Sequence, residues 1–144
     1  MMVTVAKAQM PQAYPTETTV AVSLPDVEPA GIAVSENGRI FLALPRGGVN
    51  HEHPSVVEIV NGKPVAFPDE KINENTNADY SNHLVSVLGI TLYRNTLWIL
   101  DQGKRAGISG IPNGATKIVG VDINSKKSSE ISRSPSRSLG KAYN

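Results

Sequence analysis

The chain has 144 residues, no cysteine and a formal net charge of +1 at pH 7. This length suffices for one modest hydrophobic core, and the near-neutral charge argues against a protein that binds nucleic acid through a strongly basic surface. The missing thiols exclude disulfides, thiolate catalysis and cysteine zinc sites, and no apolar run reaches the roughly 18 residues of a membrane-spanning helix.

The chain is predicted to begin with a loose arm followed by one short strand. Residues 1–16 include Pro11 and Pro15, which interrupt regular structure. Residues 17–24 are rich in threonine and valine, which favour a pleated surface, and they are predicted to form a strand.

Four further strands joined by tight turns are predicted between residues 31 and 67. The pairs Asn37-Gly38 and Asn61-Gly62 predict type I′ hairpin turns, because both residue types tolerate the positive φ that this turn requires. Pro64 cannot donate a ladder hydrogen bond, so it is predicted to lie on an edge strand or at the start of its strand. The predicted strands are 31–34, 39–44, 55–60 and 63–67.

The second half of the chain repeats the pattern of the first half. A polar loop is predicted over 68–83, and the sequence GITLYRNTLWILDQG that starts at Gly89 then resembles GIAVSENGRIFLALPRG, which starts 58 residues earlier at Gly31. Repeats of roughly this period are typical of propeller blades, here with long loops between strands. In this half, residues 84–88 resume the β pattern, residues 89–103 are predicted to form a hairpin whose second strand is 97–100, and a strand over 116–123 follows a glycine-rich loop over 102–113.

Serine, lysine and arginine dominate the chain from Ser125 onward, and residues 125–144 are predicted to form a disordered tail. The Arg-Ser spacing of SRSPSRS superficially resembles RNA-associated segments, but the run is short and a solvated tail is the preferred interpretation. The abrupt change of composition suggests a truncated or frame-shifted fragment.

Four blocks resemble successive signature blocks of the major royal jelly protein/yellow family. They are PAGIAVSENGRIFLALPRGG, PSVVEIVNGKPVAFPDE, LVSVLGITLYRNTLWILDQG and GATKIVGVDI, and together they cover residues 29–123. The resemblance implies a six-bladed β-propeller that is usually secreted. The predicted fold class is therefore all-β: a partial propeller over residues 17–124, with about two blades that are antiparallel four-stranded meanders.

The resemblance also sets the expected function. It implies a small-molecule-binding protein for an amine or aromatic ligand, without a cofactor; the alternative is a tautomerase- or lactonase-like propeller enzyme that acts on a small cyclic substrate. It implies a secreted or extracellular location, although the N-terminus is a poor signal peptide. Two blades without neighbours expose apolar faces, so self-association through these faces is expected.

Three residues at strand ends are the candidate ligand-binding residues. Asp101 and Gln102 follow a strand of the second repeat, and Arg46 follows the comparable strand of the first. Asp101 is predicted either to bind a cation or an amine, or to cap the following turn through an Asx hydrogen bond. Arg46 is predicted either to pair with Asp101 or a ligand carboxylate, or to lie solvated on the surface.

The remaining candidates favour structural roles. His51 and His53 have a spacing that suits a metal on a strand, but they lie in a predicted loop without a third ligand, and Glu28 only vaguely matches the placement of a metal ligand in gluconolactonase-like propellers. No metal site is therefore predicted. Phe41 and Trp98 occupy matched positions of the two repeats and are predicted to fill the core between blades, with stacking against an aromatic ligand as the alternative.

Overall fold

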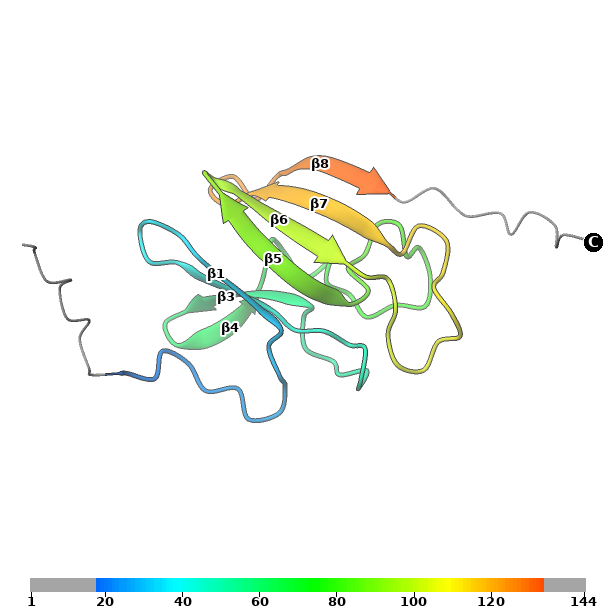
Figure 1. The fold of residues 1–144 in the computed structure, drawn as a ribbon, viewed down its shortest axis with the longest axis horizontal. Helices are drawn as coiled ribbons and strands as arrows, with labels where there is room; N and C mark the ends of the chain where they lie inside the picture. The colour runs from blue at the N-terminus through cyan, green and yellow to red at the C-terminus, as the bar shows by residue number, and fades with distance from the viewer. Residues whose placement is uncertain (1–17, 134–144) are drawn as a thin grey trace, which may run out of the picture.

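The computed structural model describes residues 18–133, which form two antiparallel sheets and no helix. Each strand pairs with the next one along the chain, so each sheet is a four-stranded meander (Figure 1). The first sheet consists of β1 (Gly31–Val34), β2 (Ile40–Ala43), β3 (Val56–Val60) and β4 (Lys63–Ala66). The second consists of β5 (Val87–Tyr93), β6 (Thr96–Asp101), β7 (Lys117–Asp122) and β8 (Ser128–Arg133). The all-β prediction is confirmed.

The main core lies between the two sheets, where β1 and β2 pack against β5. Alternation along the strands turns one apolar face of each sheet towards the other sheet, because successive side chains of a strand point to opposite faces. Phe41 is fully buried there, as predicted, and it contacts Phe67 edge to face with 4.9 Å between ring centroids. The core contains Ala33, Phe41, Ala43, Val56, Phe67, Leu84, Val87, Leu97, Ile99, Val119, Val121 and Ile123.

Trp98 does not lie in this core, so its predicted role as core packing is wrong. Its neighbours Leu97 and Ile99 are both fully buried between the sheets. The strand alternation therefore places Trp98 on the opposite, outer face of the second sheet, where it is half-buried.

A smaller cluster covers the outer face of the first sheet. Leu42, Leu44 and Val57 form its buried part, and Val22 and Leu24 pack against them from the N-terminal segment. The strand predicted over 17–24 is wrong for the described residues 18–24, which are irregular. They pack across the face of the sheet instead of pairing with its edge.

The two Asn-Gly turns differ in type. At the second, Asn61 and Gly62 have φ of 51° and 74°, as a type I′ turn requires, so that prediction is confirmed. At the first, Gly38 has φ 82° and Asn37 does not take a positive φ, and Gly38 N–H donates to the Ser35 carbonyl at 2.9 Å. Ser35 N–H donates to the Arg39 carbonyl at 2.9 Å, so residues 36–38 form the turn and the type I′ prediction is wrong there.

Two strand predictions in the second half need correction. Residues 84–86 belong to no strand, and β5 begins only at Val87. β8 lies inside the segment predicted to be a disordered tail, which is wrong for residues 128–133; residues 134–144 lie outside the described part. The Asp122 carboxylate, which accepts from the amides of Asn124 and Ser125 at 3.0 and 2.7 Å, forms the turn that returns the chain into β8.

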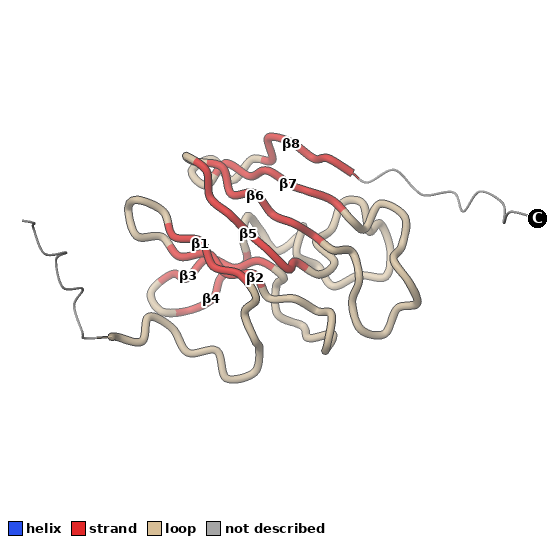
Figure 2. The backbone as a smooth tube through the Cα atoms, in the orientation of Figure 1, coloured by secondary structure: helices blue, strands red, loops and turns tan. Residues whose placement is uncertain are grey.

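The connections between strands sort to two ends of the molecule. In a meander, alternate connections lie at opposite ends of the strands. The tight hairpins lie at one end, and three long loops lie together at the other, drawn in tan in Figure 2. We call this the loop end; its loops are 44–55, 67–86 and 102–116.

Candidate functional site

Arg46 enters the loop end directly after β2 and is fully buried. Its Nη1 donates to the Leu84 carbonyl at 3.0 Å, and its Nη2 donates to the carbonyls of His53 and Asn73 at 2.7 and 3.0 Å. The predicted solvated surface position is wrong. One guanidinium therefore joins the loop 44–55 to two points of the loop 67–86.

Burial changes the acid–base behaviour of Arg46. Desolvation, assisted by repulsion from Arg105, lowers the pKa of Arg46 to about 10, because the cation loses hydration that carbonyl dipoles replace only in part. The side chain is still a cation at neutral pH. Among the described residues it forms no ion pair, and its Nε has no hydrogen-bond partner.

Asp101 ends β6 and is also fully buried. Its Oδ2 accepts from the Val85 amide at 2.8 Å, and its Oδ1 accepts from the amides of Ser86 and Gly103 at 3.0 Å each. The bond from Gly103 is the Asx hydrogen bond predicted as the structural alternative, which is confirmed. Arg46 binds carbonyls of the segment 84–86 and Asp101 binds its amides, so the two charged groups hold the same segment but form no ion pair with each other.

Lys117 is the ion-pair partner of Asp101. The two residues face each other in the β6–β7 ladder, with Nζ 2.8 Å from Oδ2 and both side chains almost fully buried. Lys117 Nζ also donates to the carbonyls of Tyr80 and Ala115 at 2.9 and 3.0 Å. All three ammonium hydrogens therefore have acceptors, which a buried amine requires.

Gln102 completes this network. Its Nε2 donates to Ser86 Oγ at 3.1 Å, and that hydroxyl oxygen also accepts from the Arg46 amide at 2.9 Å. Gln102 N–H donates to the Ser86 carbonyl at 3.1 Å. The structure thus brings Arg46, Asp101 and Gln102 together around the segment 84–86. Their predicted ligand binding stays a prediction, since the hydrogen bonds described for them go to protein groups.

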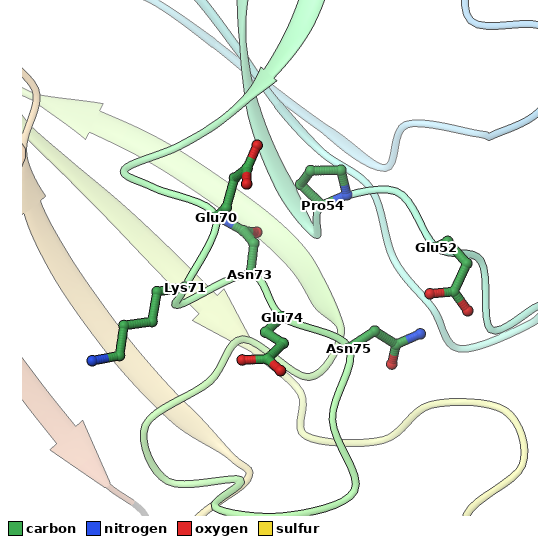
Figure 3. A pocket seen from close by; sticks show the side chains of 7 residues that line it. All are labelled: Glu52, Pro54, Glu70, Lys71, Asn73, Glu74 and Asn75. Carbon is green, nitrogen blue, oxygen red and sulfur yellow. The ribbon is translucent and has the colours of Figure 1, made fainter.

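An open cleft lies beside this network, between the loops 44–55 and 67–86. Its volume is about 640 Å³, and Figure 3 shows its side chains. Three carboxylates and one ammonium group face it, which gives the lining a net negative charge. The lining residues are Glu52, Pro54, Glu70, Lys71, Asn73, Glu74 and Asn75.

Asn73 fixes the base of the cleft. Its Oδ1 accepts from the Val56 amide at 2.9 Å, and its Nδ2 donates to the carbonyls of Phe67 and Asp69, each at 2.9 Å. Its own carbonyl accepts from Arg46. The side chain is satisfied by these contacts, so Asn73 shapes the cleft from below while the exposed glutamates around it remain accessible.

Asn75 and Arg105 connect the cleft to the third loop. Arg105 donates from its two terminal nitrogens to the side-chain oxygens of Asn75 and Asn77. Asn75 Nδ2 donates in turn to Asn50 Oδ1 at 3.0 Å. All three long loops are therefore tied together by side chains around one wall of the cleft.

His51 and His53, whose spacing alone would suit a metal and for which structural roles are predicted, lie outside the cleft lining. His51 Nε2 donates to the Pro45 carbonyl at 3.1 Å, and burial, followed by the proximity of Arg46, lowers the pKa of His51. The rings of His51 and His53 have centroids 5.6 Å apart. Among residues 18–133, no three or more His, Cys, Asp or Glu side chains are grouped to hold a metal ion, and no helix could cross a membrane.

The sequence reasoning missed Lys117, Ser86 and Asn73. The buried ion pair of Lys117 could have been suspected from the sequence. A lysine at the start of the apolar run KIVGV must either lie on a solvated face or have a buried acidic partner. No sequence pattern indicates the roles of Ser86 and Asn73, since each binds backbone groups of segments that are distant in sequence.

Comparison with models of known protein families finds no match to this chain. A search of curated proteins finds no similar sequence either.

Proposed function

We propose that the chain is a non-catalytic binding protein of the major royal jelly protein/yellow type, and that it holds a small organic amine in the cleft at the loop end. The observation that carries the proposal is the cleft lining, in which Glu52, Glu70 and Glu74 outnumber the single cation Lys71. Carboxylates attract an ammonium group and strengthen its hydrogen bonds.

Arg46 and Asp101 act in this proposal as positioning residues. They hold the segment 84–86 and the cleft base at Asn73, so the walls of the cleft are joined before a ligand arrives. A preformed site lowers the ordering cost of binding. Gln102 supports the same segment through Ser86.

The experiment is a calorimetric titration of the full chain with tyramine, an aromatic amine, and with 4-ethylphenol, which lacks the charged nitrogen. We expect saturable binding of tyramine that weakens as salt is added, and no binding of the neutral analogue, because screening reduces interactions between exposed charges. Saturable heat from 4-ethylphenol, or tyramine binding that does not change with salt, would contradict the electrostatic basis.

Variants of the cleft carboxylates test whether the ligand binds in the cleft. Glu70→Gln and Glu74→Gln each remove one exposed carboxylate and leave the described hydrogen bonds of the cleft base intact. Each is expected to weaken binding by up to about fivefold, since an exposed ion pair contributes about 0.2–1 kcal/mol. Glu36→Gln, on the hairpin at the opposite end, is the control and should bind like the unchanged chain. Equal binding by all three variants would place the ligand elsewhere.

A measurement of substrate turnover distinguishes the enzyme alternative from the binding proposal. A lactonase-like activity should consume a small lactone, stop when a chelator is added and return with a divalent ion. The binding proposal expects no consumption of the lactone at any stage.

A further inference from the structure

An open polar cleft lies at the end of the sheets opposite the loop end. We call this the hairpin end, because the tight hairpins lie there (Figure 1). The cleft has a volume of about 420 Å³, which is within the range of about 300–1,000 Å³ that is usual for small-molecule sites. Its walls are the turn between β1 and β2, the turn between β5 and β6, and the turn after β7, so it shares no lining residue with the cleft at the loop end.

Two opposite charges lie on different walls of this cleft. Among the described residues, the charged side chains of the lining are Glu36 from the first hairpin and Arg94 from the second. The spacing of 58 residues that relates Gly31 to Gly89 also relates Glu36 to Arg94, so the two turns carry opposite charges at matched positions. Both side chains are exposed, and neither belongs to an ion pair among residues 18–133. The cleft therefore offers one carboxylate and one guanidinium group to a ligand.

Side-chain amides complete the polar lining. Asn37 and Asn95 hold matched positions of the two hairpins by the same spacing, and Asn124 comes from the turn after β7. Asn37 Oδ1 accepts from Ser35 Oγ, whereas the side-chain amides of Asn95 and Asn124 have no hydrogen-bond partner within the described part of the chain. An amide presents two donors and an acceptor oxygen, so these side chains can bind a polar group in either role without adding charge.

The walls of the cleft are joined to each other through buried contacts. Arg39 pairs with Glu58 of the first sheet, with 2.7 Å between Nε and Oε1, and its Nη1 donates to the Ile123 carbonyl at 2.8 Å. Ile123 N–H donates in turn to the Asn95 carbonyl at 2.8 Å. The two hairpins are thus connected through one buried residue of the lining, and a preformed site lowers the ordering cost of binding.

We propose that the cleft at the hairpin end binds a small zwitterion of the α-amino acid class, with the ligand ammonium group on Glu36 and the ligand carboxylate on Arg94. The guanidinium can hold a carboxylate through two parallel hydrogen bonds, and the amides of Asn95 and Asn124 bind a neutral polar side chain of the ligand. A monocation such as tyramine meets Arg94 as well as Glu36, so this cleft is not expected to hold it. The site and its ligand class are separate from the amine cleft and do not depend on the proposed function.

The first test is an NMR titration of the isotope-labelled full chain with three matched probes. L-glutamine carries both charges, 4-carbamoylbutanoate lacks its ammonium group, and 4-aminobutanamide lacks its carboxylate. We expect L-glutamine to shift the backbone amide signals of Asn37, Asn95 and Asn124 until they saturate. Each analogue should bind about two- to fivefold more weakly, since an exposed ion pair contributes about 0.2–1 kcal/mol. The proposal is overturned if L-glutamine gives no saturable shifts at these residues, or if either analogue binds as tightly.

Two variants then assign the charges of the ligand to the walls. Glu36→Gln and Arg94→Gln each neutralise one wall at an exposed side chain that forms none of the described hydrogen bonds, so melting should match the unchanged chain. Each is expected to weaken L-glutamine about two- to fivefold. In Glu36→Gln, removal of the ammonium group from the probe should cost no further affinity, and in Arg94→Gln the same should hold for removal of the carboxylate. Lys63→Gln, at an exposed position on β4, is the control and should bind L-glutamine like the unchanged chain.

The variants can also refute the assignment. If the loss of the ammonium group costs as much in Glu36→Gln as in the unchanged chain, Glu36 is not its partner and the proposal fails. Unchanged L-glutamine binding in both variants overturns it as well, because the charges would then contribute nothing to the site.

Discussion

Replacing Asp101 by asparagine should unfold the chain much more easily, although it changes one oxygen to nitrogen. If the amide oxygen keeps the place of Oδ1, it still accepts from Ser86 and Gly103. The amide nitrogen then faces the Val85 amide and the Lys117 ammonium group, which both lose their acceptor at 2.8 Å. The Val85 amide and the Lys117 ammonium group, both buried donors, would then face the amide nitrogen of the new side chain, which is a donor as well.

The size of the effect follows from these contacts. Removing one partner of a buried ion pair costs about 3–5 kcal/mol, because the other charge stays buried without compensation. Domains of this size are stable by about 5–15 kcal/mol, so a large part of the total would be lost. With a urea dependence of about 2 kcal/mol per molar, the unfolding midpoint should fall by roughly 2 M.

The assay is urea unfolding of the full chain, followed by circular dichroism and by the fluorescence of Trp98, the single tryptophan. Lys117→Met should cost a similar amount, and the double variant should cost at least 2 kcal/mol less than the sum, since removing both charges leaves neither uncompensated. Additive effects within about 0.5 kcal/mol would refute the reasoning. An Asp101→Asn chain of unchanged stability that fails to bind tyramine would instead support direct ligand contact by Asp101.

The remaining predictions concern three other loop-end positions. Arg46→Met should lower the urea midpoint by at least 1 M, because the buried carbonyls of Leu84 and Asn73 lose their donor, each at a cost of about 1–3 kcal/mol. Gly103→Ala should lower the melting temperature more than Gly62→Ala: both have φ near +73°, but the new Cβ at 103 would lie 2.5 Å from the Thr116 nitrogen and at 62 would meet nothing within 4 Å. His51 has a lowered pKa in the folded chain, so the unfolded chain takes up its proton first. Stability should therefore be full above pH 6.5, fall as the pH drops through the folded pKa, and fall less in His51→Gln when urea midpoints are compared across pH.

The strands were predictable where a local rule specified them. Asn61-Gly62 permits positive φ at both turn residues, and Pro64 lies on β4, the edge strand, as its missing donor requires. The strand predicted over 17–24 is wrong for residues 18–24, because β propensity alone does not supply a partner strand. β8 was missed because its polar sequence carries no apolar alternation, while its backbone pairs along β7.

The location of the candidate site could be predicted from the sequence, but the hydrogen-bond partners of its residues could not. Arg46, Asp101 and Gln102 were located at strand ends, and the structure gathers them at one end of both sheets. Arg46 and Asp101 bind backbone groups of residues 84–86, and no residue type reveals a hydrogen bond to a main-chain atom 15 to 38 residues away. The burial of Arg46 has the same origin: its solvation is replaced by carbonyls from two loops, not by an acidic residue that a sequence pattern could show.

Trp98 shows how a repeat can be read correctly while the packing derived from it is wrong. The match to Phe41 holds in the ladder, since each pairs with the equivalent residue of the preceding strand. Because the two residues occupy equivalent ladder positions, their side chains lie on equivalent faces of the two sheets. That face packs against the second sheet in the first sheet, but it is an outer face in the second sheet. Phe41 is therefore buried and Trp98 is not, for one and the same reason. Trp98 is therefore half-buried on a face that neither sheet of residues 18–133 covers.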